Sequence, residues 1–365
     1  MSTHLSDVAA EGLTSTAFAP PVLVDPDLVL DRVLAEGFDR ASATGPGQVA
    51  LWAALGDATR GGKRFRPALV LAAYDALGGS DHEAAAHLGA AVELLHTAFV
   101  VHDDVIDGDD VRRGRPNVSG TFTARARDEG AGASEAAHLG LTAGILAGDL
   151  ALAAALRTVA TCPADAATVV RLLDLFDQAL HTTAAGELAD VRFSVGAEPP
   201  SLGEALTMEE QKTAAYSFAL PLQAGAVLAG ASDQEVRRLG DAGRMLGVAF
   251  QLRDDLLGAF GDPAVTGKSS LSDLREGKQT PLVAYARTTA VWPQVAVHLG
   301  CRDLTETEAD VVRALLEECG ARTFVERLVE DYVHGARRVL DELGLPVERL
   351  GVLALLTPES PGRAA

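Results

Sequence analysis

The chain has 365 residues, of which 48% are hydrophobic and 5% aromatic, and its formal net charge is −20 at pH 7. This composition supplies apolar material for a large core, and it excludes a disordered chain, a collagen-like repeat and a disulfide-stabilised miniprotein. So acidic a chain repels nucleic acid and anionic membrane surfaces unless its basic residues cluster. Cys162, Cys301 and Cys319 match no metal-binding or disulfide spacing, so we expect reduced thiols and a cytoplasmic protein.

The predicted elements begin after an N-terminal tail. Residues 1–25 lack the basic start and apolar run of a signal peptide and are predicted to be partly disordered. Residues 26–345 repeat apolar positions at helical spacing, closed by Gly or Pro, with little strand-type alternation. We therefore expect one all-α domain, followed by a C-terminal tail over 346–365. The predicted helices cover residues 27–42, 46–59, 64–78, 81–106, 138–160, 164–193, 202–230, 232–258, 279–299, 306–319 and 321–343.

Three segments carry further structural expectations. Residues 114–137 are rich in Gly, Ser and charge, which predicts a mobile loop. The apolar stretch 140–160 is interrupted by Asp149 and Arg157, so it predicts a buried core helix and no integral membrane span. Pro221 is expected to kink or break the helix that contains it.

The most informative segment is HTAFVVHDDVIDGDDVRRGRP, residues 96–116, where five aspartates crowd together. Such mutually repelling carboxylates beside an apolar run are costly unless cations hold them, although a solvated acidic helix end is the alternative. On a helix, Asp103 and Asp107 stack one turn apart and Asp104 lies about 100° round from Asp103, so all three can point into one cavity. Oxygen ligands without a His or Cys pattern favour Mg²⁺, which often bridges to a substrate phosphate.

A second acidic cluster lies in AFQLRDDLLGAFGDP, residues 249–263, where Gln251, Asp254 and Asp255 share one helix face. Basic residues accompany both clusters, and such bases beside Mg-binding carboxylates suit a polyanionic ligand such as a diphosphate. These bases are Lys63, Arg64, Arg66, Arg112, Arg113, Lys212, Lys268 and Lys278.

Together these segments resemble the motifs of the trans-isoprenyl diphosphate synthases, or polyprenyl synthetases. GGKRFRP is similar to the family's GGKRxRP, HDDVIDGDDVRRGRP to its first aspartate-rich motif, DDxxD, and QLRDDLLGAFGDPAVTGKSSLSDLREGKQTP to its second aspartate-rich region. GELAD, residues 186–190, and the Lys212–Thr213 pair are also similar, and the resemblance covers about residues 30–345 in the family's order. Gly258 stands where the second motif's third acid is expected, so metal binding there must rest on Asp254, with or without Asp255.

The resemblance implies an isoprenoid synthase fold, a bundle of about ten or more helices around a central active-site cavity. It also implies a homodimer that condenses isopentenyl diphosphate head-to-tail with an allylic diphosphate of the C5–C15 range. Three Mg²⁺ ions, replaceable by Mn²⁺, would be held by Asp103, Asp107 and Asp254 and would neutralise the departing diphosphate, which then accepts the released proton.

The resemblance also distributes roles among side chains. The catalytic set is Asp103, Asp104, Asp107, Arg112, Lys212, Asp254 and Lys268. The allylic diphosphate is assigned to Arg112, Lys212, Thr213, Gln251, Lys268 and Lys278, and isopentenyl diphosphate to Lys63, Arg66, His96 and Arg113. Ala98 and Phe99 lie about one turn below Asp103, on the side where the growing chain should run. One small and one bulky residue there predict a C20 product, geranylgeranyl diphosphate, with a C15 (farnesyl) or longer product as the alternative.

Three other readings compete with a synthase. A class I terpene cyclase would share the first motif but normally carries an NDxxSxxxE-type second motif, which this sequence lacks. A di-iron carboxylate bundle fits two ExxH matches, Glu93–His96 and Glu135–His138, but leaves the aspartate pairs and lysines unexplained. A non-catalytic subunit of a heteromeric synthase conflicts with the intact first motif and both basic clusters.

Overall fold

The structure is a computed structural model, and it describes residues 25–196, 198–261, 272–345 and 347–350. The predicted tails therefore lie largely outside the described residues, as does Lys268. The elements, in chain order, are α1 (Pro26–Thr44), α2 (Pro46–Thr59), α3 (Phe65–Ala76), α4 (His82–Asp107), β1 (Val111–Arg112), β2 (Arg115–Pro116), α5 (Val118–Asp128), α6 (Ala133–Ala160), α7 (Ala166–Val195), α8 (Leu202–Glu209), the π-helix η1 (Glu210–Ala219), α9 (Leu220–Leu228), α10 (Asp233–Phe260), α12 (Ser272–Glu276), α13 (Pro281–Ala286), α14 (Trp292–Ala296), α15 (Glu306–Glu318), α16 (Ala321–Glu342) and the 3₁₀ helix η2 (Val347–Leu350).

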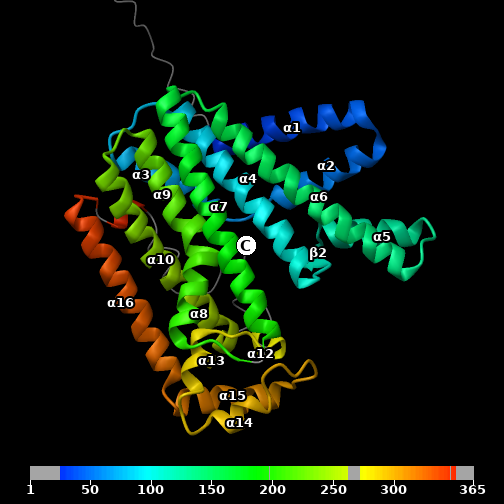
Figure 1. The fold of residues 1–365 in the computed structure, drawn as a ribbon, viewed down its shortest axis with the longest axis vertical. Coiled ribbons are helices and arrows are strands. Elements are labelled where there is room, and N and C mark those ends of the chain that lie inside the picture. The colour runs from blue at the N-terminus through cyan, green and yellow to red at the C-terminus, as the bar shows by residue number, and fades with distance from the viewer. Residues whose placement is uncertain (1–24, 197, 262–271, 346, 351–365) are drawn as a thin grey trace, which may run out of the picture.

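Helix α4 is the central element of the bundle (Figure 1). Its N-terminal half is mostly apolar and is buried from Ala84 to Leu95, because α1, α3, α6 and α9 pack around it. The Asp81 side chain accepts hydrogen bonds from the first-turn backbone, and Gly108, with φ 72°, ends the helix. The acidic C-terminal turn thus emerges from the core at a fixed place. The predicted all-α fold is confirmed.

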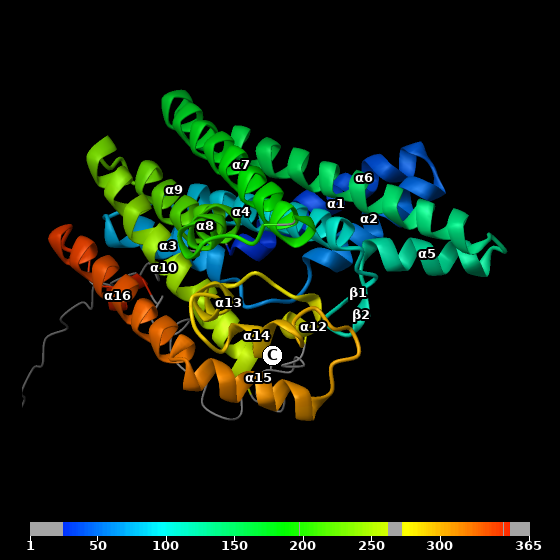
Figure 2. The same ribbon diagram turned by 60° about the horizontal axis from the view of Figure 1, so that its bottom comes forward.

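Helix α6 is less buried than its sequence predicts. Helices α4 and α6 are both long and apolar enough to cross a membrane by length and composition, yet 83% of the apolar window of α4 lies inside the fold against 39% for α6. Leu139, Leu141, Ile145 and Leu146 are 41–48% exposed along one face of α6. The expectation of a buried core helix is therefore wrong for this face, because no described element covers it. The α5–α6 end projects from the bundle in both views (Figures 1 and 2).

The predicted loop over residues 114–137 is also wrong, because most of this segment is folded. A two-stranded hairpin pairs Val111 with Pro116, and Arg113 and Gly114 form its tight turn with φ values of 51° and 71°. Asn117 then caps α5, whose Val118 and Phe122 are buried against α2 and α6. The Gly and Ser residues that suggested mobility instead form turns or pack closely against neighbouring backbone. The hairpin folds back toward the end of α4.

The predicted helix over residues 202–230 consists of three consecutive helical segments. Between α8 and α9 lies the ten-residue π-helix η1, and the helical backbone continues from η1 through Pro221 in α9, so the expected break at Pro221 does not occur. The predicted helix over 279–299 is likewise divided, into α13 and α14, with turns between them. Helix α10 packs against η1 on one side and α16 on the other. Because η1 also packs against α7, it lies between α7 and α10, and α10 carries the second acidic cluster.

Candidate active site

The end of α4 and the hairpin form the first cluster of charges. The Arg112 guanidinium on β1 donates from Nε to Asp104 Oδ1 at 2.6 Å and from Nη2 to Asp103 Oδ2 at 3.1 Å. Burial raises the pKa values of Asp104 and Asp107, and the negative charge of Asp103 raises both further. The positive charges of Arg112 and Lys212 offset part of this effect at Asp104 and Asp107, respectively, and a bound cation would offset more of it.

Lys212 on η1 connects this cluster to α7. Its Nζ lies 3.2 Å from Asp103 Oδ1, 3.1 Å from Glu187 Oε2 and 2.7 Å from Asp190 Oδ2. Burial works to lower the pKa of Lys212, but the charges of Asp103, Asp190 and Glu187 outweigh burial and raise it. The lysine is therefore a permanent cation among three acids, held where α4, α7 and η1 meet. Thr213, the next residue, is partly buried.

Arg66 and Arg113, two of the residues assigned to isopentenyl diphosphate, act on His96, which lies one turn above Phe99. Burial lowers the pKa of His96 well below its usual value, and the charges of Arg66, Arg113 and Arg112 lower it further, so the imidazole is neutral near pH 7. The side chain of Arg113 lies beside the Gly61–Gly62 loop, where both glycines have φ 82°. Lys63 follows on the exposed part of this loop. The structure thus relates Arg66 and Arg113 to His96, and the grouping of all four residues, Lys63 included, stays a prediction.

Tyr216 joins this cationic cluster to the predicted chain-length position. Its hydroxyl lies 3.2 Å from His96 Nδ1 and 3.5 Å from Arg66 Nη2, and its ring contacts the edge of the Phe99 ring with centroids 4.7 Å apart. Arg66, itself buried, also donates from Nε to Ser217 Oγ at 3.0 Å. Phe99 is thus partly buried against an aromatic wall, whereas Ala98 is fully buried against Trp52 and its neighbours.

The second acidic cluster lies on α10. Asp254 is exposed, whereas Asp255 is buried and its Oδ1 accepts a hydrogen bond from Gln251 Nε2 at 3.3 Å. Asp255 also meets the buried carboxyl group of Glu209, and each of these two groups retains one buried oxygen without a hydrogen-bond partner. Burial raises the pKa of Asp255 to about 7, and burial followed by the charge of Asp255 raises that of Glu209 strongly. Both carboxyl groups therefore keep their protons to higher pH than solvent-exposed carboxyl groups do.

Lys278 belongs with this second cluster. Its Nζ lies 2.9 Å from Asp273 Oδ1 and 3.4 Å from Glu276 Oε2. Burial works to lower the pKa of Lys278, and the charges of Asp273 and Glu276 raise it above its usual value. Asp273 also raises the pKa of Asp255, so the lysine and the second motif share one electrostatic environment.

Asp190 on α7 connects the two acidic clusters. Its charge raises the pKa of Asp107 in the first cluster and that of Glu209 in the second. Both clusters thus lie within electrostatic reach of one carboxylate, as two motifs that act on a single ligand require.

The donor set fits magnesium better than iron. Within the described ranges, no three His, Cys, Asp or Glu side chains form a ready metal-ligand group. Mg²⁺ needs only one or two protein carboxylates, with water and substrate phosphate completing its shell. A di-iron site at the first ExxH match is not supported, because its two residues have other partners. Glu93 forms an ion pair with Arg64 at 2.7 Å, and His96 contacts Tyr216.

Sequence reasoning did not assign several residues of this site. Glu187 and Asp190 occur in GELAD, which matched a family pattern, and that match was the available signal for them. Tyr216 follows the Lys212–Thr213 pair by three positions and carried no separate signal. Glu209, which precedes Glu210, and Asp273 carried no separate signal, and only folding brings them to Asp255.

The family model described as polyprenyl synthetase matches residues 50–318. The chain belongs to the polyprenyl synthetase family. It is therefore a prenyltransferase, and its helical bundle is the all-α fold of that family.

Among curated relatives, this polyprenyl synthetase is 39% identical to the geranylgeranyl diphosphate synthase of Sulfolobus acidocaldarius over 62% of this chain and 63% of that enzyme. It is 33% identical to the (2E,6E)-farnesyl diphosphate synthase of Mycobacterium tuberculosis over 78% of this chain and 75% of that enzyme. Its structure is similar, with a TM-score of 0.80 and 32% identity, to geranylgeranyl pyrophosphate synthase from Corynebacterium glutamicum complexed with isoprenyl diphosphate and magnesium. That similarity covers 91% of this chain and 96% of the Corynebacterium chain.

Proposed function

We propose that this polyprenyl synthetase condenses isopentenyl diphosphate with an allylic diphosphate and that its main product is geranylgeranyl diphosphate. The observation that carries the proposal is the junction at Asp103, which meets Arg112 at 3.1 Å and Lys212 at 3.2 Å. The carboxylates proposed to bind metal and the cations proposed to bind diphosphate thus lie together at the end of α4. A diphosphate leaving group needs this mixture, because its charge grows as its bond to carbon breaks.

Each charged group has a role in this proposal. Asp103 and Asp107 on α4 and Asp254 on α10 would hold three Mg²⁺ ions, and the bound metal neutralises the charge of the departing diphosphate. The allylic diphosphate would be held by Arg112, Lys212, Thr213, Gln251, Lys268 and Lys278. The catalytic set also includes Asp104, which orients Arg112 through their 2.6 Å ion pair.

The second substrate would bind around His96. Lys63, Arg66 and Arg113 would carry the charge of isopentenyl diphosphate, and the neutral imidazole of His96 would donate or accept a hydrogen bond without adding charge. After the new carbon–carbon bond forms, the proton released from the substrate would pass to the departing diphosphate, so no side-chain base is needed.

Product length would be limited by Phe99, whose ring contacts Tyr216. Its partly buried ring would close the path along α4, while the small Ala98 side chain is fully buried against Trp52 and its neighbours. Relatives named for C20 products support this choice, and the matches to a farnesyl and a geranylfarnesyl diphosphate synthase keep the C15 and C25 products as the alternatives.

The exposed face of α6 supports a homodimer. Leu139, Leu141, Ile145 and Leu146 form an apolar strip on one helix, and a second copy of the same helix is proposed to cover it. The charge of −20 and the burial of α4 favour a soluble, cytoplasmic enzyme with no nucleic acid partner and no integral membrane span.

One assay tests the proposed reaction. Purified protein would be incubated with Mg²⁺, labelled isopentenyl diphosphate and C5, C10 or C15 allylic diphosphate, and products would be separated by chain length. We expect a labelled C20 product from each starter. Geranylgeranyl diphosphate incubated alone should yield no hydrocarbon or alcohol, because a terpene cyclase would release one. Absence of any elongation by the lone chain would contradict the proposal.

A further inference from the structure

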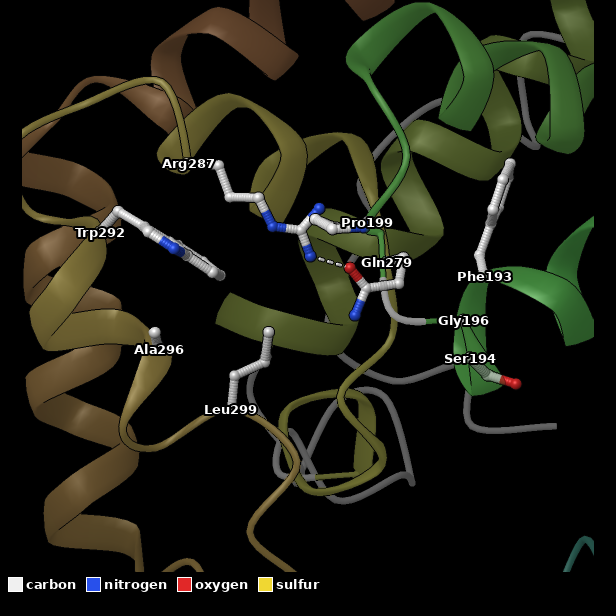
Figure 3. Close-up of a pocket in the computed structure, with 9 residues that line it drawn as sticks. All are labelled: Phe193, Ser194, Gly196, Pro199, Gln279, Arg287, Trp292, Ala296 and Leu299. Atoms are coloured by element: carbon white, nitrogen blue, oxygen red, sulfur yellow. Dashed lines mark hydrogen bonds between the residues drawn. The ribbon is translucent and has the colours of Figure 1, made fainter.

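A cavity that none of the proposed reaction residues lines lies at the C-terminal end of α7. It has a volume of about 320 Å³ and is open on one side (Figure 3). Its walls come from the end of α7, from the chain that leads into α8, from Gln279 just before α13, and from the segment between the end of α13 and α15. The residues used below are Phe193, Pro199, Gln279, Arg287, Trp292 and Leu299.

Among the described residues that line this cavity, Arg287 is the only one with a charged side chain. It donates hydrogen bonds to Gln279 Oε1 and to the Pro200 carbonyl oxygen, the latter at 3.4 Å. Its Nε is buried and has no hydrogen-bond partner. Burial lowers the pKa of Arg287, and no carboxylate in the described part of the chain acts on it. A guanidinium without an acid is unusual in a chain with 51 acidic and 31 basic residues, and a buried donor without a partner costs free energy.

The surfaces beside the guanidinium are flat and apolar. The Arg287 Cζ atom lies 5.0 Å from the centroid of the Trp292 ring. Figure 3 shows Trp292 and Leu299 on one side of the cavity and Phe193 on the other, with Arg287 and Gln279 between them. A cation flanked by aromatic and aliphatic walls binds ligands that combine an anionic group with a planar body.

We propose that this cavity is a binding site for a monoanionic organic ligand with a planar, apolar body, such as an aromatic carboxylate or sulfonate. The anionic group would accept hydrogen bonds from Arg287, and the planar body would lie against Trp292 and Leu299. A single guanidinium matches one negative charge, whereas a diphosphate requires several cations and metal, so substrates of the main site are poor candidates. Gln279 directly follows Lys278, so the cavity adjoins the proposed diphosphate site without sharing a side chain with it.

Fluorescence of the intact protein tests this proposal. The chain has two tryptophans, so a Trp52→Phe background leaves Trp292 as the single donor for energy transfer. The probe is 8-anilinonaphthalene-1-sulfonate, a monoanionic aromatic sulfonate. We expect saturable energy transfer from Trp292, weakened on the order of tenfold or more by Arg287→Gln, because a hydrogen bond to a charged group is lost. The matched control, Arg302→Gln, removes an exposed arginine and should change the affinity less than about twofold.

A competition experiment keeps the test valid if the Arg287 variant folds poorly. In the Trp52→Phe protein, benzenesulfonate should displace the probe, and neutral benzyl alcohol at the same concentration should displace it far less. Equal displacement by the two compounds, equal affinity in Arg287→Gln, or no saturable transfer from Trp292 would each overturn the proposal. None of these readouts involves prenyl transfer, so failure of the proposed reaction would leave this result unaffected.

Discussion

The carboxylate of Asp273 occupies the space beside the α carbon of Gly258. A β carbon added to Gly258 would collide with Asp273 Oδ2, while Oδ1 of the same carboxylate pairs with Lys278 at 2.9 Å. Gly258 stands where the second aspartate-rich motif is expected to have its third acid. In this chain a carboxylate reaches the same region from α12 instead of from α10, and it fixes a lysine proposed to bind diphosphate.

Gly258→Asp should therefore be harmful, even though it restores the family motif. Two carboxylates would compete for one space, and Asp273 would have to release Lys278. We expect turnover to fall on the order of tenfold, with a lower melting temperature, since a buried unpaired charge is destabilising. Combining Gly258→Asp with Asp273→Ala should recover part of both losses. Gly203→Asp, at a glycine with open space around it, is the control. A fully active, stable Gly258→Asp enzyme would show that the space is not limiting.

Asp103→Asn tests the junction of the two charge systems. The variant keeps the shape of the side chain but removes the charge that Arg112, Lys212 and the proposed metal require. Turnover measured with saturating Mg²⁺ should fall on the order of 10²-fold or more, the scale found when preorganised electrostatic groups are lost. Asp109→Asn changes an exposed acid of the same cluster and should stay within a few fold of the unmodified enzyme. Nearly normal turnover in Asp103→Asn would remove Asp103 from the proposed metal site.

Phe99→Ala should lengthen the product. Removing the ring leaves Tyr216 without its edge contact and opens space one turn below Asp103. Chromatography of the extracted prenyl alcohols should show products beyond C20, with total incorporation of label changed less than product length. Phe38→Ala, at an exposed phenylalanine of α1, is the control for loss of a ring elsewhere. An unchanged C20 product would mean that another residue limits the chain.

Ile145→Glu should disrupt the proposed dimer. The substitution places a charge in the middle of the exposed apolar strip of α6, where a second copy would bury it without a partner. Sedimentation velocity at micromolar concentration should shift from dimer toward monomer. Val311→Glu introduces the same charge on α15 at a residue that is 48% exposed, against 44% for Ile145, and should leave the mass unchanged. A monomeric unmodified protein would show that there is no dimer. A dimeric Ile145→Glu variant would show that the interface lies elsewhere.

The Glu209–Asp255 pair should make the metal-free protein less stable as pH rises. Burial raises the folded-state pKa of both groups, to about 7 for Asp255, whereas their ordinary values are 4.5 and 3.8. Between these limits the folded protein binds a proton that the unfolded chain has released, so raising the pH favours unfolding. Burial raises the pKa values of Asp104, Asp107 and Glu187 in the same direction.

Melting temperatures measured in a chelator from pH 5 to pH 8 should therefore decline. Glu209→Gln should flatten the decline, because an amide needs no proton to remain neutral, while Glu318→Gln at an exposed position should not. A decline of equal slope in the Glu209 variant would show that this pair does not control it.

The sequence by itself determined the helical class, the family and the charged residues of both motifs. These features are local: apolar periodicity marks a helix, and Asp103 and Asp107 are neighbours on any helix that contains them. The short hairpin at Arg113 was missed because its turn uses positive φ at a non-glycine residue, which composition does not reveal. The apolar face of α6 was read as buried because hydropathy reports a preference for burial and not whether a neighbour is present.

Only the tertiary structure decided which distant groups meet. Lys212 joins Asp103 to Glu187 and Asp190, and Asp273 fills the space beside Gly258, and both contacts connect separate helices. Electrostatic effects on pKa values and the shape of a cavity depend on distances of a few ångströms between separate helices. Those distances follow from how the helices pack, so only after α7, α13 and α14 were placed together did Arg287 become recognisable as a partly buried cation on which no described carboxylate acts.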